Sequence, residues 1–540
     1  MPSGAGLHAI ETVILLLLVM VAAFAVVAHR LKVPYPIVLV LAGLAISFVP
    51  RMPRIPLDPS LVFLIFLPPL LYSAAWTTSW REFRHNLVLI SLLAVGLVGF
   101  TVWGVAVISE HFITALDWKA GFLLGAVIST TDAIAATSIA RSIGLPRRIV
   151  DILEGESLLN DATGLLALEL GVSIIMRGEA PSVGSGVVRL LYLIAGGVGI
   201  GLVIGVVVRW VERFIDNGPV EIVVSLIVPY AAYLAGEHVH ASGVLAVVTC
   251  GLYLSRGSAT FFSAGVRIQV LAVWDALNFM LNGIVFVLIG LQLPYVLAGI
   301  RGAYGMETLL EYGAIFSAIL IALRLAWVFP AVKMASLLRR WTGHPEQQPG
   351  ARDVFVIGWT GMRGVLALAA AISVPTTMAN GAPFGPRNLI VFLAFCVILV
   401  TLVLQGLTLP SVIRGLGLAG ATGMSAEERE ARKIALEEAI AYLEAGRSHR
   451  GNNFFHAFDD LLDRYHHRLA DVETGQGGDD DHAHGAETYR QVMEAGEGAV
   501  QAERRAIIRL RDEGRISDDV MRTLERELDL EESRYQVARS

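Results

Sequence analysis

Residues 155–170, GESLLNDATGLLALEL, place a glutamate, an asparagine and an aspartate within one strongly apolar stretch. On a helix, Ser157 and Asp161 are four residues apart and share one face, while Glu156 and Asn160 form the neighbouring stripe. Carboxylate, hydroxyl and amide oxygens are hard ligands that suit small hard cations, and the softer ligands sulfur and imidazole are absent nearby. The stretch is therefore a candidate site for a metal cation.

Asp161 can also bind a proton. Burial disfavours the ionised form of a carboxylate, so such a group takes up a proton more readily than an exposed aspartate does. One carboxylate cannot comfortably hold a proton and a cation together. Competition between the two at Asp161 is the simplest physical route to exchange of one for the other. The alternative is a neutral Asp161 that is hydrogen-bonded in a polar helix interface.

Glu156 needs a partner if its surroundings are apolar, because an unpaired buried charge strongly destabilises a fold. Arg324, within the apolar segment IALRLAWVFP, is the best candidate. We expect Glu156 and Arg324 to form a structural ion pair, with a direct role in transport as the alternative.

Two other apolar stretches are interrupted near their middle. The first, GAVISTTDAIAATSIA (125–140), contains hydroxyl residues and Asp132, and the second, VIGWTGMRGVLALAAAI (356–372), contains glycines and Arg363. Paired interrupted helices are the best sequence indication of a transporter site. An acidic residue at one break and a basic residue at the other would balance the partial charges of the helix ends. The exposed carbonyl of Thr131 could help to bind a cation. The hydroxyls could instead bond back to helix carbonyls.

These stretches belong to a chain whose composition is typical of a membrane protein. Of its 540 residues, 55% are hydrophobic and only 17% are charged, whereas soluble domains carry about a quarter charged residues. Apolar stretches recur from about residue 10 to residue 417, each near the ~20 residues that cross a bilayer as a helix. The first resembles a membrane span more than a cleaved signal, since its basic residues follow the apolar core. About thirteen spans are expected: 10–28, 34–50, 59–77, 87–109, 119–140, 149–176, 186–210, 219–236, 241–255, 268–293, 309–331, 353–374 and 388–414.

Loop charges and composition predict the topology and two domains. The loops that include Arg30, Arg81, Arg141 and Arg209 carry about twice as many basic residues as the alternate loops, and positive charge favours the cytoplasm. An odd number of spans then places the N-terminus outside the plasma or inner membrane. We expect a transmembrane domain over 1–417 and a cytoplasmic tail over 418–540, whose charged, amphipathic helices would serve regulation or association.

Several polar features have two readings in the sequence. Glu169 could face a water-filled funnel or approach the far surface, and GEHVHA (236–241) could sense pH or be a solvated loop. Asp275, Asn278 and Asn282 share a helical face and could join helices or line the ion path. The His- and Asp-rich segment 465–485 is better explained as a linker than as a metal site, because it lacks a compact ligand spacing.

Four segments resemble one known family, the sodium/proton exchangers of the NhaP and NHE type. Residues 154–168, EGESLLNDATGLLAL, resemble the Asn-Asp signature of that family, and STTDAIA (129–135) resembles its Thr-Asp break. GMRGVLALA (361–369) resembles its Gly-x-Arg-Gly segment, and FLPPLLYSAAW (66–76) resembles its third span. The four occur in order, and the resemblance covers about residues 10–415.

The resemblance implies an all-α polytopic membrane protein with NhaA-like inverted repeats, two crossed discontinuous helices and a homodimer. It also implies roles for individual residues. Asp161 would bind the exchanged ion with help from Ser157 and the Thr131 carbonyl, the three together holding the transported metal cation. Asp132 and Arg363 would balance the crossed helices. Glu156 would pair with Arg324.

Two positions refine what the resemblance implies. Asn160 stands where the electrogenic branch of the family has a second aspartate, so electroneutral one-for-one exchange is expected. Ser73 stands where many relatives carry an acidic residue that helps to bind the ion in some of them. This departure leaves sodium, lithium and potassium all open as the exchanged cation, with sodium preferred.

The function predicted is antiport of a monovalent cation and protons, with a role in pH and sodium homeostasis. A K⁺/H⁺ antiporter or a proton-coupled carrier of another solute on the same fold is an alternative. A cation channel would need rings of charge or carbonyls along a continuous pore. A membrane hydrolase using Ser157 or Asp161 would lack a base to activate it. We expect a non-enzymatic protein without cofactor or nucleic-acid partner, its partners being the two ions, the bilayer and a second copy.

Overall fold

The computed structural model describes residues 4–49, 58–112, 116–177, 182–215, 217–261, 264–300, 302, 304–341, 349–378, 381–420 and 426–449, with shorter pieces between 459 and 532. The chain forms two compact units, Met1–Ala421 and Thr422–Ser540. The regular secondary structure in the described part of the first unit is helical, and an isolated β-bridge joins Thr377 and Pro383. Its helices are α1 (Gly4–Leu31), α2 (Tyr35–Ser47), α3 (Pro59–Ile65), α4 (Leu67–Thr77), α5 (Trp80–Ser91), η1 (Leu92–Gly96), α6 (Leu97–Phe112), α7 (Trp118–Ser129), α8 (Ala133–Ile143), α9 (Arg147–Arg177), α10 (Val183–Glu212), α11 (Gly218–His238), α12 (Gly243–Phe261), α13 (Ala264–Leu291), α14 (Leu293–Ile300), α15 (Met306–Trp341), α16 (Ala351–Trp359), α17 (Val365–Ser373), α18 (Arg387–Val400), η2 (Thr401–Gln405) and α19 (Gly406–Gly415).

Each of the thirteen apolar stretches coincides with helix in this unit. Within the described residues, ten helical segments are long and apolar enough to cross a membrane. Two more stretches form the shorter apolar helices Tyr35–Ser47 and Gly243–Gly257, and the stretch 353–374 is divided between α16 and α17. The structure therefore confirms an all-α protein with many membrane spans, while thirteen crossings stays a prediction.

The helix that begins as α7 is broken at residues 130–132. Asp117 caps the start of α7 by accepting a hydrogen bond from the Ala120 N–H at 2.9 Å. The chain then becomes extended at Thr130. Asp132 starts α8 as its N-cap, with its carboxylate accepting from the Ile134 N–H at 2.8 Å, an arrangement that satisfies one of the free amides of a new helix. The interruption predicted from STTD is thus a helix end followed by a capped helix start.

A second break, at residues 360–364, separates α16 from α17. The two breaks are bonded to each other, since the Asp132 N–H donates to the Met362 carbonyl at 2.9 Å. Thr401 adds a further contact by accepting from the Arg363 N–H at 3.3 Å. The two expected discontinuous helices therefore meet at their breaks.

Two π-helical turns, η1 and η2, were not anticipated from the sequence. Such turns leave backbone carbonyls without their usual helical partners, and side chains from other helices satisfy two of them. Thr163 in α9 donates to the Ala94 carbonyl at 2.7 Å, and Trp327 Nε1 in α15 donates to the Leu92 carbonyl at 3.0 Å. η1 is thereby fixed between α9 and α15.

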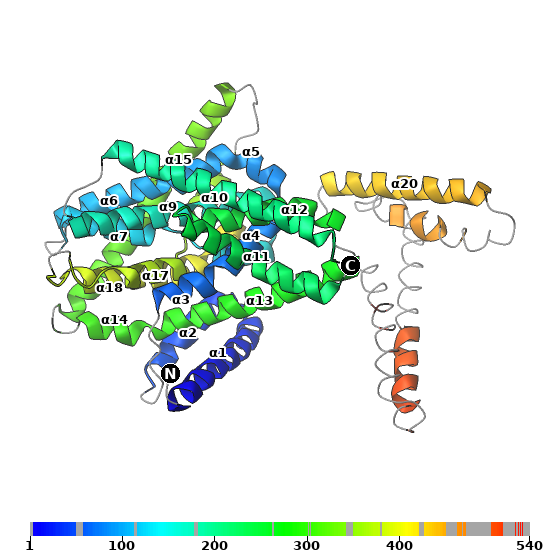
Figure 1. Ribbon diagram of the computed structural model, residues 1–540, viewed down its shortest axis with the longest axis horizontal. Helices are drawn as coiled ribbons and strands as arrows, with labels where there is room; N and C mark the ends of the chain where they lie inside the picture. The colour runs from blue at the N-terminus through cyan, green and yellow to red at the C-terminus, as the bar shows by residue number, and fades with distance from the viewer. Residues whose placement is uncertain are drawn as a thin grey trace. The chain divides into compact units, whose positions relative to one another are not determined.

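The helices pack through small residues, as is usual in membranes. Many of them run along a common direction, among them α6, α7, α10, α13 and α18 (Figure 1). The pair α2 and α13 is one of the most extensive contacts, and Gly43 faces Gly290 at this crossing. A Cβ added at Gly290 would lie 2.5 Å from Leu44 N and 2.8 Å from Gly43 C, both of which are backbone atoms that cannot move aside.

We therefore expect Gly290→Ala to push α2 away from α13 and to destabilise the protein by about 1–3 kcal/mol, the usual cost of overpacking. The measurement is the thermal unfolding midpoint of the detergent-solubilised protein. Gly199→Ala is the matched control, because a Cβ there meets nothing within 4 Å. An unchanged midpoint for Gly290→Ala would show that the crossing is looser than described.

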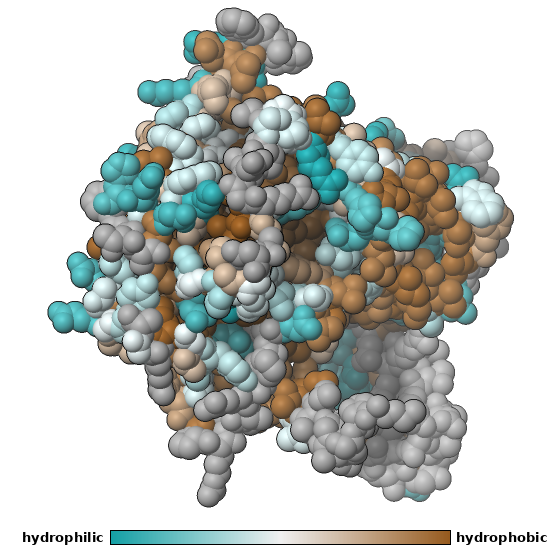
Figure 2. Space-filling model, turned by 60° about the vertical axis from the view of Figure 1, so that its left-hand side comes forward, coloured by the Kyte–Doolittle hydropathy of each residue, from teal (hydrophilic) through white to brown (hydrophobic). Residues whose placement is uncertain are grey.

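The surface of the first unit carries broad apolar areas next to hydrophilic side chains (Figure 2). α10 contributes many exposed apolar residues, including Val188, Leu191, Val203 and Trp210. In the most apolar 18-residue stretch of Gly184–Glu212, only 17% is buried inside the protein. Such exposure would be costly in water and is expected of helices that face lipid or another membrane protein.

The second unit contains α20 (Ala426–His449), a charged helix with an i,i+4 ion pair between Lys433 and Glu437 at 3.9 Å. Arg504 and Glu532 form another ion pair at 2.6 Å. The described part of the tail is therefore helical at several places. Residues 467 and 471–485, the larger part of the His- and Asp-rich segment 465–485, lie outside the described residues.

Candidate ion-binding site

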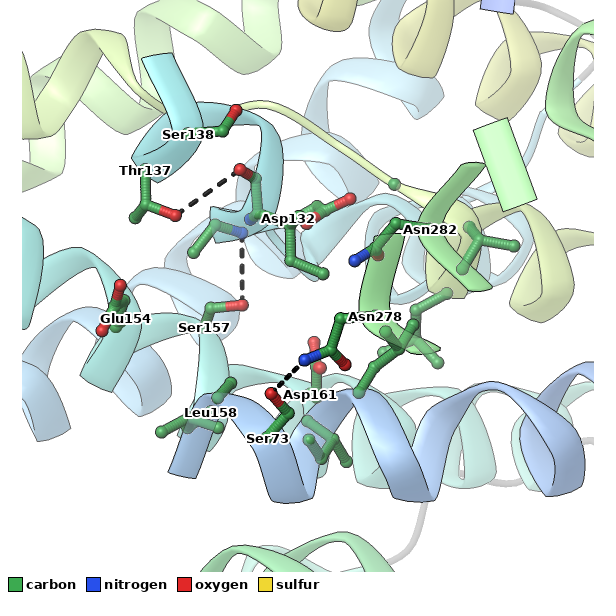
Figure 3. Close-up of a pocket in the computed structure, with 18 of the residues that line it drawn as sticks. Ser73, Asp132, Thr137, Ser138, Glu154, Ser157, Leu158, Asp161, Asn278 and Asn282 are labelled. Atoms are coloured by element: carbon green, nitrogen blue, oxygen red, sulfur yellow. Dashed lines mark hydrogen bonds between the residues drawn. The ribbon is translucent and has the colours of Figure 1, made fainter. Parts of the chain in front are cut away.

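A cavity of about 300 Å³ lies at the two helix breaks (Figure 3). It is lined by residues of both breaks, by one face of α9 and, across the cavity, by α4 and α13. Most of its wall is apolar. The polar side chains that line it include Ser73, Asp132, Ser157, Asp161, Asn278 and Asn282.

Two carboxylates that line this cavity, Asp161 and Asp275, have no hydrogen bond or ion pair within the described residues, and of the two only Asp161 is buried. Asp161 is only 8% exposed. Another acid, Asp132, is close enough to interact with it electrostatically. An ionised carboxylate in such surroundings is unfavourable unless it binds a proton or a cation.

Ser157 and the Thr131 carbonyl meet one turn of α9 below Asp161. The Ser157 hydroxyl donates to the Thr131 carbonyl at 2.9 Å and accepts from the Ala133 N–H at 3.4 Å. Ser157 therefore holds the extended residues of the first break against α9. A carbonyl oxygen has two lone pairs, so Thr131 retains one that is not used by Ser157.

Asp132 lies between the starts of two helices. Its carboxylate caps α8, and a Cβ added at Gly364, the residue before α17, would lie 2.7 Å from Asp132 Cγ. The partial positive charges of two helix N-termini therefore stabilise this carboxylate. Gly364 is required because its missing side chain makes room for Asp132.

Glu156 and Arg324 form a fully buried bidentate ion pair, with Nη1–Oε1 at 2.5 Å and Nη2–Oε2 at 2.9 Å. Thr131 Oγ1 also donates to Glu156 at 3.1 Å. Arg324 donates in addition to the carbonyls of Ile357 and Gly358 at 3.0 and 3.2 Å. Arg324 thus donates hydrogen bonds to carbonyls at the end of α16, where no backbone N–H of the same helix is available to them.

Asn160 and Arg363 lie behind the cavity wall and are not among the residues that line it. Asn160 Nδ2 donates to Thr131 Oγ1, so Asn160 positions the break, and its buried Oδ1 has no hydrogen-bond partner among the described residues. Arg363 is 1% exposed, and its Nε and Nη1 find no hydrogen-bond acceptor in the described part of the chain. Its charge is close enough to interact with Glu156 and Arg324.

The wall opposite Asp161 contains two residues that sequence reasoning did not connect. Asn278 of α13 donates through Nδ2 to the Ser73 hydroxyl of α4, and the two side chains point toward each other in Figure 3. Asn278 therefore both joins helices and lines the cavity. No sequence signal linked these residues, since they are 205 positions apart.

An ion pair between Arg141 and Glu154, with a distance of 2.5 Å, also borders the cavity. Arg141 is 57% exposed, so this end of the cavity is near the surface. The arrangement as a whole can admit a small cation or a proton to the buried, unpaired carboxylate of Asp161, beside the Ser157 hydroxyl and the Thr131 carbonyl. Within the described residues, no group of three or more His, Cys, Asp or Glu could hold a resident metal ion.

Two broken helices that meet beside a cavity with a buried, unpaired carboxylate are the architecture of a secondary transporter. The transmembrane sodium/hydrogen exchanger family matches residues 14–415, and the chain belongs to this family. An uncharacterized Na⁺/H⁺ exchanger of Mycobacterium tuberculosis is 34% identical over 530 residues, covering 96% of this chain and 95% of the relative. The Na⁺/H⁺ antiporter ApNhaP of Aphanothece halophytica is 34% identical over 417 residues, covering 77% and 76%.

A solved structure supports the same fold. The sodium/proton antiporter MjNhaP1 of Methanocaldococcus jannaschii superimposes with a TM-score of 0.59 at 20% identity, over 76% of this chain and 99% of that protein. The predicted family and fold class are confirmed. The match to the mycobacterial relative reaches beyond residue 415, so it includes part of the tail, which the resemblance from motifs did not cover.

Proposed function

We propose that this protein exchanges one monovalent cation for one proton, both competing for Asp161, in the plasma or inner membrane. The cation proposed is sodium, and lithium and potassium are the alternatives. The observation that carries the proposal is the Asp161 carboxylate, which is buried at the cavity without a partner among the described residues. Ser157 and the Thr131 carbonyl would complete the cation site.

Charges at the crossing support electroneutral exchange. Glu156 is balanced by Arg324, and the negative charge of Asp132 is matched by the positive charge of Arg363 on the other break. Asp161 adds one negative charge, which either a proton or a monovalent cation neutralises. The site would therefore carry the same net charge with either cargo, and a complete cycle would move no charge across the membrane.

The remaining parts of the proposal concern the assembly and its role. An N-terminus outside and a cytoplasmic tail follow from the loop charges. The lipid-facing apolar surface of α10 is available to a second copy, which supports a homodimer. The cellular role proposed is pH and sodium homeostasis.

The test uses the purified protein in liposomes that contain a pH-sensitive dye. Addition of Na⁺, Li⁺, K⁺ or choline to the outside should produce proton movement with Na⁺ and not with choline, and an imposed membrane potential should not alter its rate. Proton movement with K⁺ alone would replace sodium by potassium in the proposal. Cation flux that follows voltage without proton movement would instead indicate a channel.

A further inference from the structure

One face of α9 lines both the cavity at Asp161 and a second cavity, of about 350 Å³. The first cavity is lined by Glu154, Ser157, Leu158 and Asp161 of α9. The second is lined by Ala162, Leu165, Leu166 and Glu169 of the same helix. These positions continue one i, i+3, i+4, i+7 pattern, so they form a single stripe. The first cavity ends at Asp161, and the second begins at the next residue.

The second cavity is polar at the end away from Asp161. Glu169, Arg189, Glu237 and His240 line it there, about 12 Å along α9 from Asp161, at 1.5 Å per residue. Glu237 is partly engaged, because its Oε1 accepts from the Gly243 N–H at 3.2 Å. Ala162, Leu165 and Leu166 supply the apolar part of the wall between this end and Asp161. The second cavity thus has charged side chains at one end and a short apolar section toward Asp161, as an entrance to an ion-binding site would have. We call this cavity the vestibule.

Arg189 of α10 joins both sides of this vestibule. It donates to Glu169 of α9 at 3.2 Å and to the His240 carbonyl, in the turn between α11 and α12, at 3.1 Å. The ring of Tyr192, one turn further along α10, lies 5.8 Å from the Arg189 guanidinium, and its hydroxyl donates to the Val239 carbonyl at 2.7 Å. These contacts hold α10 against the end of α11, and the Arg189–Glu169 ion pair links α10 to α9.

The ion pair itself is partly open to solvent. The Arg189 and Glu169 side chains are 35% and 55% exposed, and pairs with this exposure are weak because water screens them. An ion pair that breaks in every transport cycle must contribute little free energy, as a solvent-screened pair does. Its loss would shift a balance between two conformations rather than unfold the protein.

We propose that the second cavity is the outer half of the path by which the cation reaches Asp161. In this proposal the Glu169–Arg189 ion pair, here called the latch, keeps the outer half closed while the first cavity is open. The inference rests on the proposed antiport, because only a carrier that alternates between two faces needs two half-routes that meet at one carboxylate. Glu169 and Arg189 act on which face is open. They are not ligands of the bound cation.

The experiment measures the access of a membrane-impermeant, positively charged thiol reagent to reporter cysteines in sealed vesicles. The chain has two cysteines, Cys250 and Cys396, which are first replaced by alanine. Ala162→Cys then reports on the second cavity and Ser138→Cys on the first. In the parent background, Ser138→Cys should react from the cytoplasmic face only, and Ala162→Cys should react slowly from the outer face.

Adding Glu169→Gln or Arg189→Gln should raise the labelling rate of Ala162→Cys about two- to fivefold, as expected for loss of a weak ion pair. The same changes should lower the rate at Ser138→Cys. Arg209→Gln, near the other end of α10, is the control and should change neither rate. The exchanged pair Glu169→Arg with Arg189→Glu should return both rates toward the parent.

Parent-like rates in both latch variants would overturn the latch, and labelling of Ala162→Cys from the cytoplasmic face would overturn the outer half-route. If Ala162→Cys impairs folding, Leu165→Cys provides the same readout from the same cavity. Labelling does not require transport. A parent protein without antiport activity would therefore refute the proposed function, while the labelling rates would still decide between an open and a closed second cavity.

Discussion

Asp161→Asn should reduce cation-dependent proton movement in liposomes to the level of protein-free vesicles. The amide keeps the size of the side chain, but it takes up no proton and lacks the negative charge that binds the cation and makes the two ions compete. Loss of a residue that merely supports a metal ligand costs about 10- to 100-fold, so loss of the ligand itself should exceed this. The measurement is the initial rate of pH change after addition of the cation identified for the parent protein.

The stability of this variant separates a site effect from misfolding. Because the Asp161 carboxylate has no ionic partner among the described residues, its replacement by a neutral amide removes an unfavourable buried charge. The thermal unfolding midpoint of Asp161→Asn should therefore equal or exceed that of the parent. Asp161→Glu is the companion variant, which keeps a carboxylate and should retain measurable exchange. Full activity of Asp161→Asn would exclude competition at this residue.

Replacement of either member of the Glu156–Arg324 pair should destabilise the protein by about 3–5 kcal/mol, because each single change leaves the other charge buried without its partner. Glu156→Leu and Arg324→Met are the variants, and the thermal unfolding midpoint in detergent is the measurement. Both residues are almost completely buried, at 1% and 2% exposure, so solvent cannot compensate for the loss.

The double variant Glu156→Leu with Arg324→Met should recover part of this loss, since apolar residues of similar volume often replace a buried ion pair without penalty. Recovery should be incomplete, because the Gly358 carbonyl also loses its side-chain donor and the Ile357 carbonyl keeps only the Thr360 hydroxyl. Two single variants with parent-like midpoints would contradict a structural role for the pair.

Local pattern was sufficient for the helices and for the positions of their breaks. The apolar stretches, each near the length of a membrane span, predicted all thirteen helical regions. Hydroxyl, glycine and charged residues marked the interruptions at 130–132 and 360–364. The π-helical turns η1 and η2 were not predicted. In η1 the released carbonyls are bonded by side chains of distant helices, such as Thr163, which a local pattern does not reveal.

Charge in an apolar setting also indicated the site. Asp161, Ser157 and Asp132 stood out because ionisable and polar groups are rare within membrane spans. The need for a buried countercharge led to Arg324, which the structure places against Glu156. The different tasks of these neighbours were less predictable. Asn160 is adjacent to Asp161 in sequence, yet its amide bonds Thr131 from behind the wall.

The sequence by itself determined that this protein is an all-helical membrane carrier and singled out Asp161 as the candidate ion-binding carboxylate, because periodicity, span length and charge within an apolar stretch are local properties of the chain. Only the tertiary structure decided which polar groups share a cavity. Ser73 meets Asn278 and Arg189 meets Glu169 through the packing of helices that lie far apart in sequence or on different spans. Such contacts depend on the depth and rotation of each helix, which many neighbouring side chains set together.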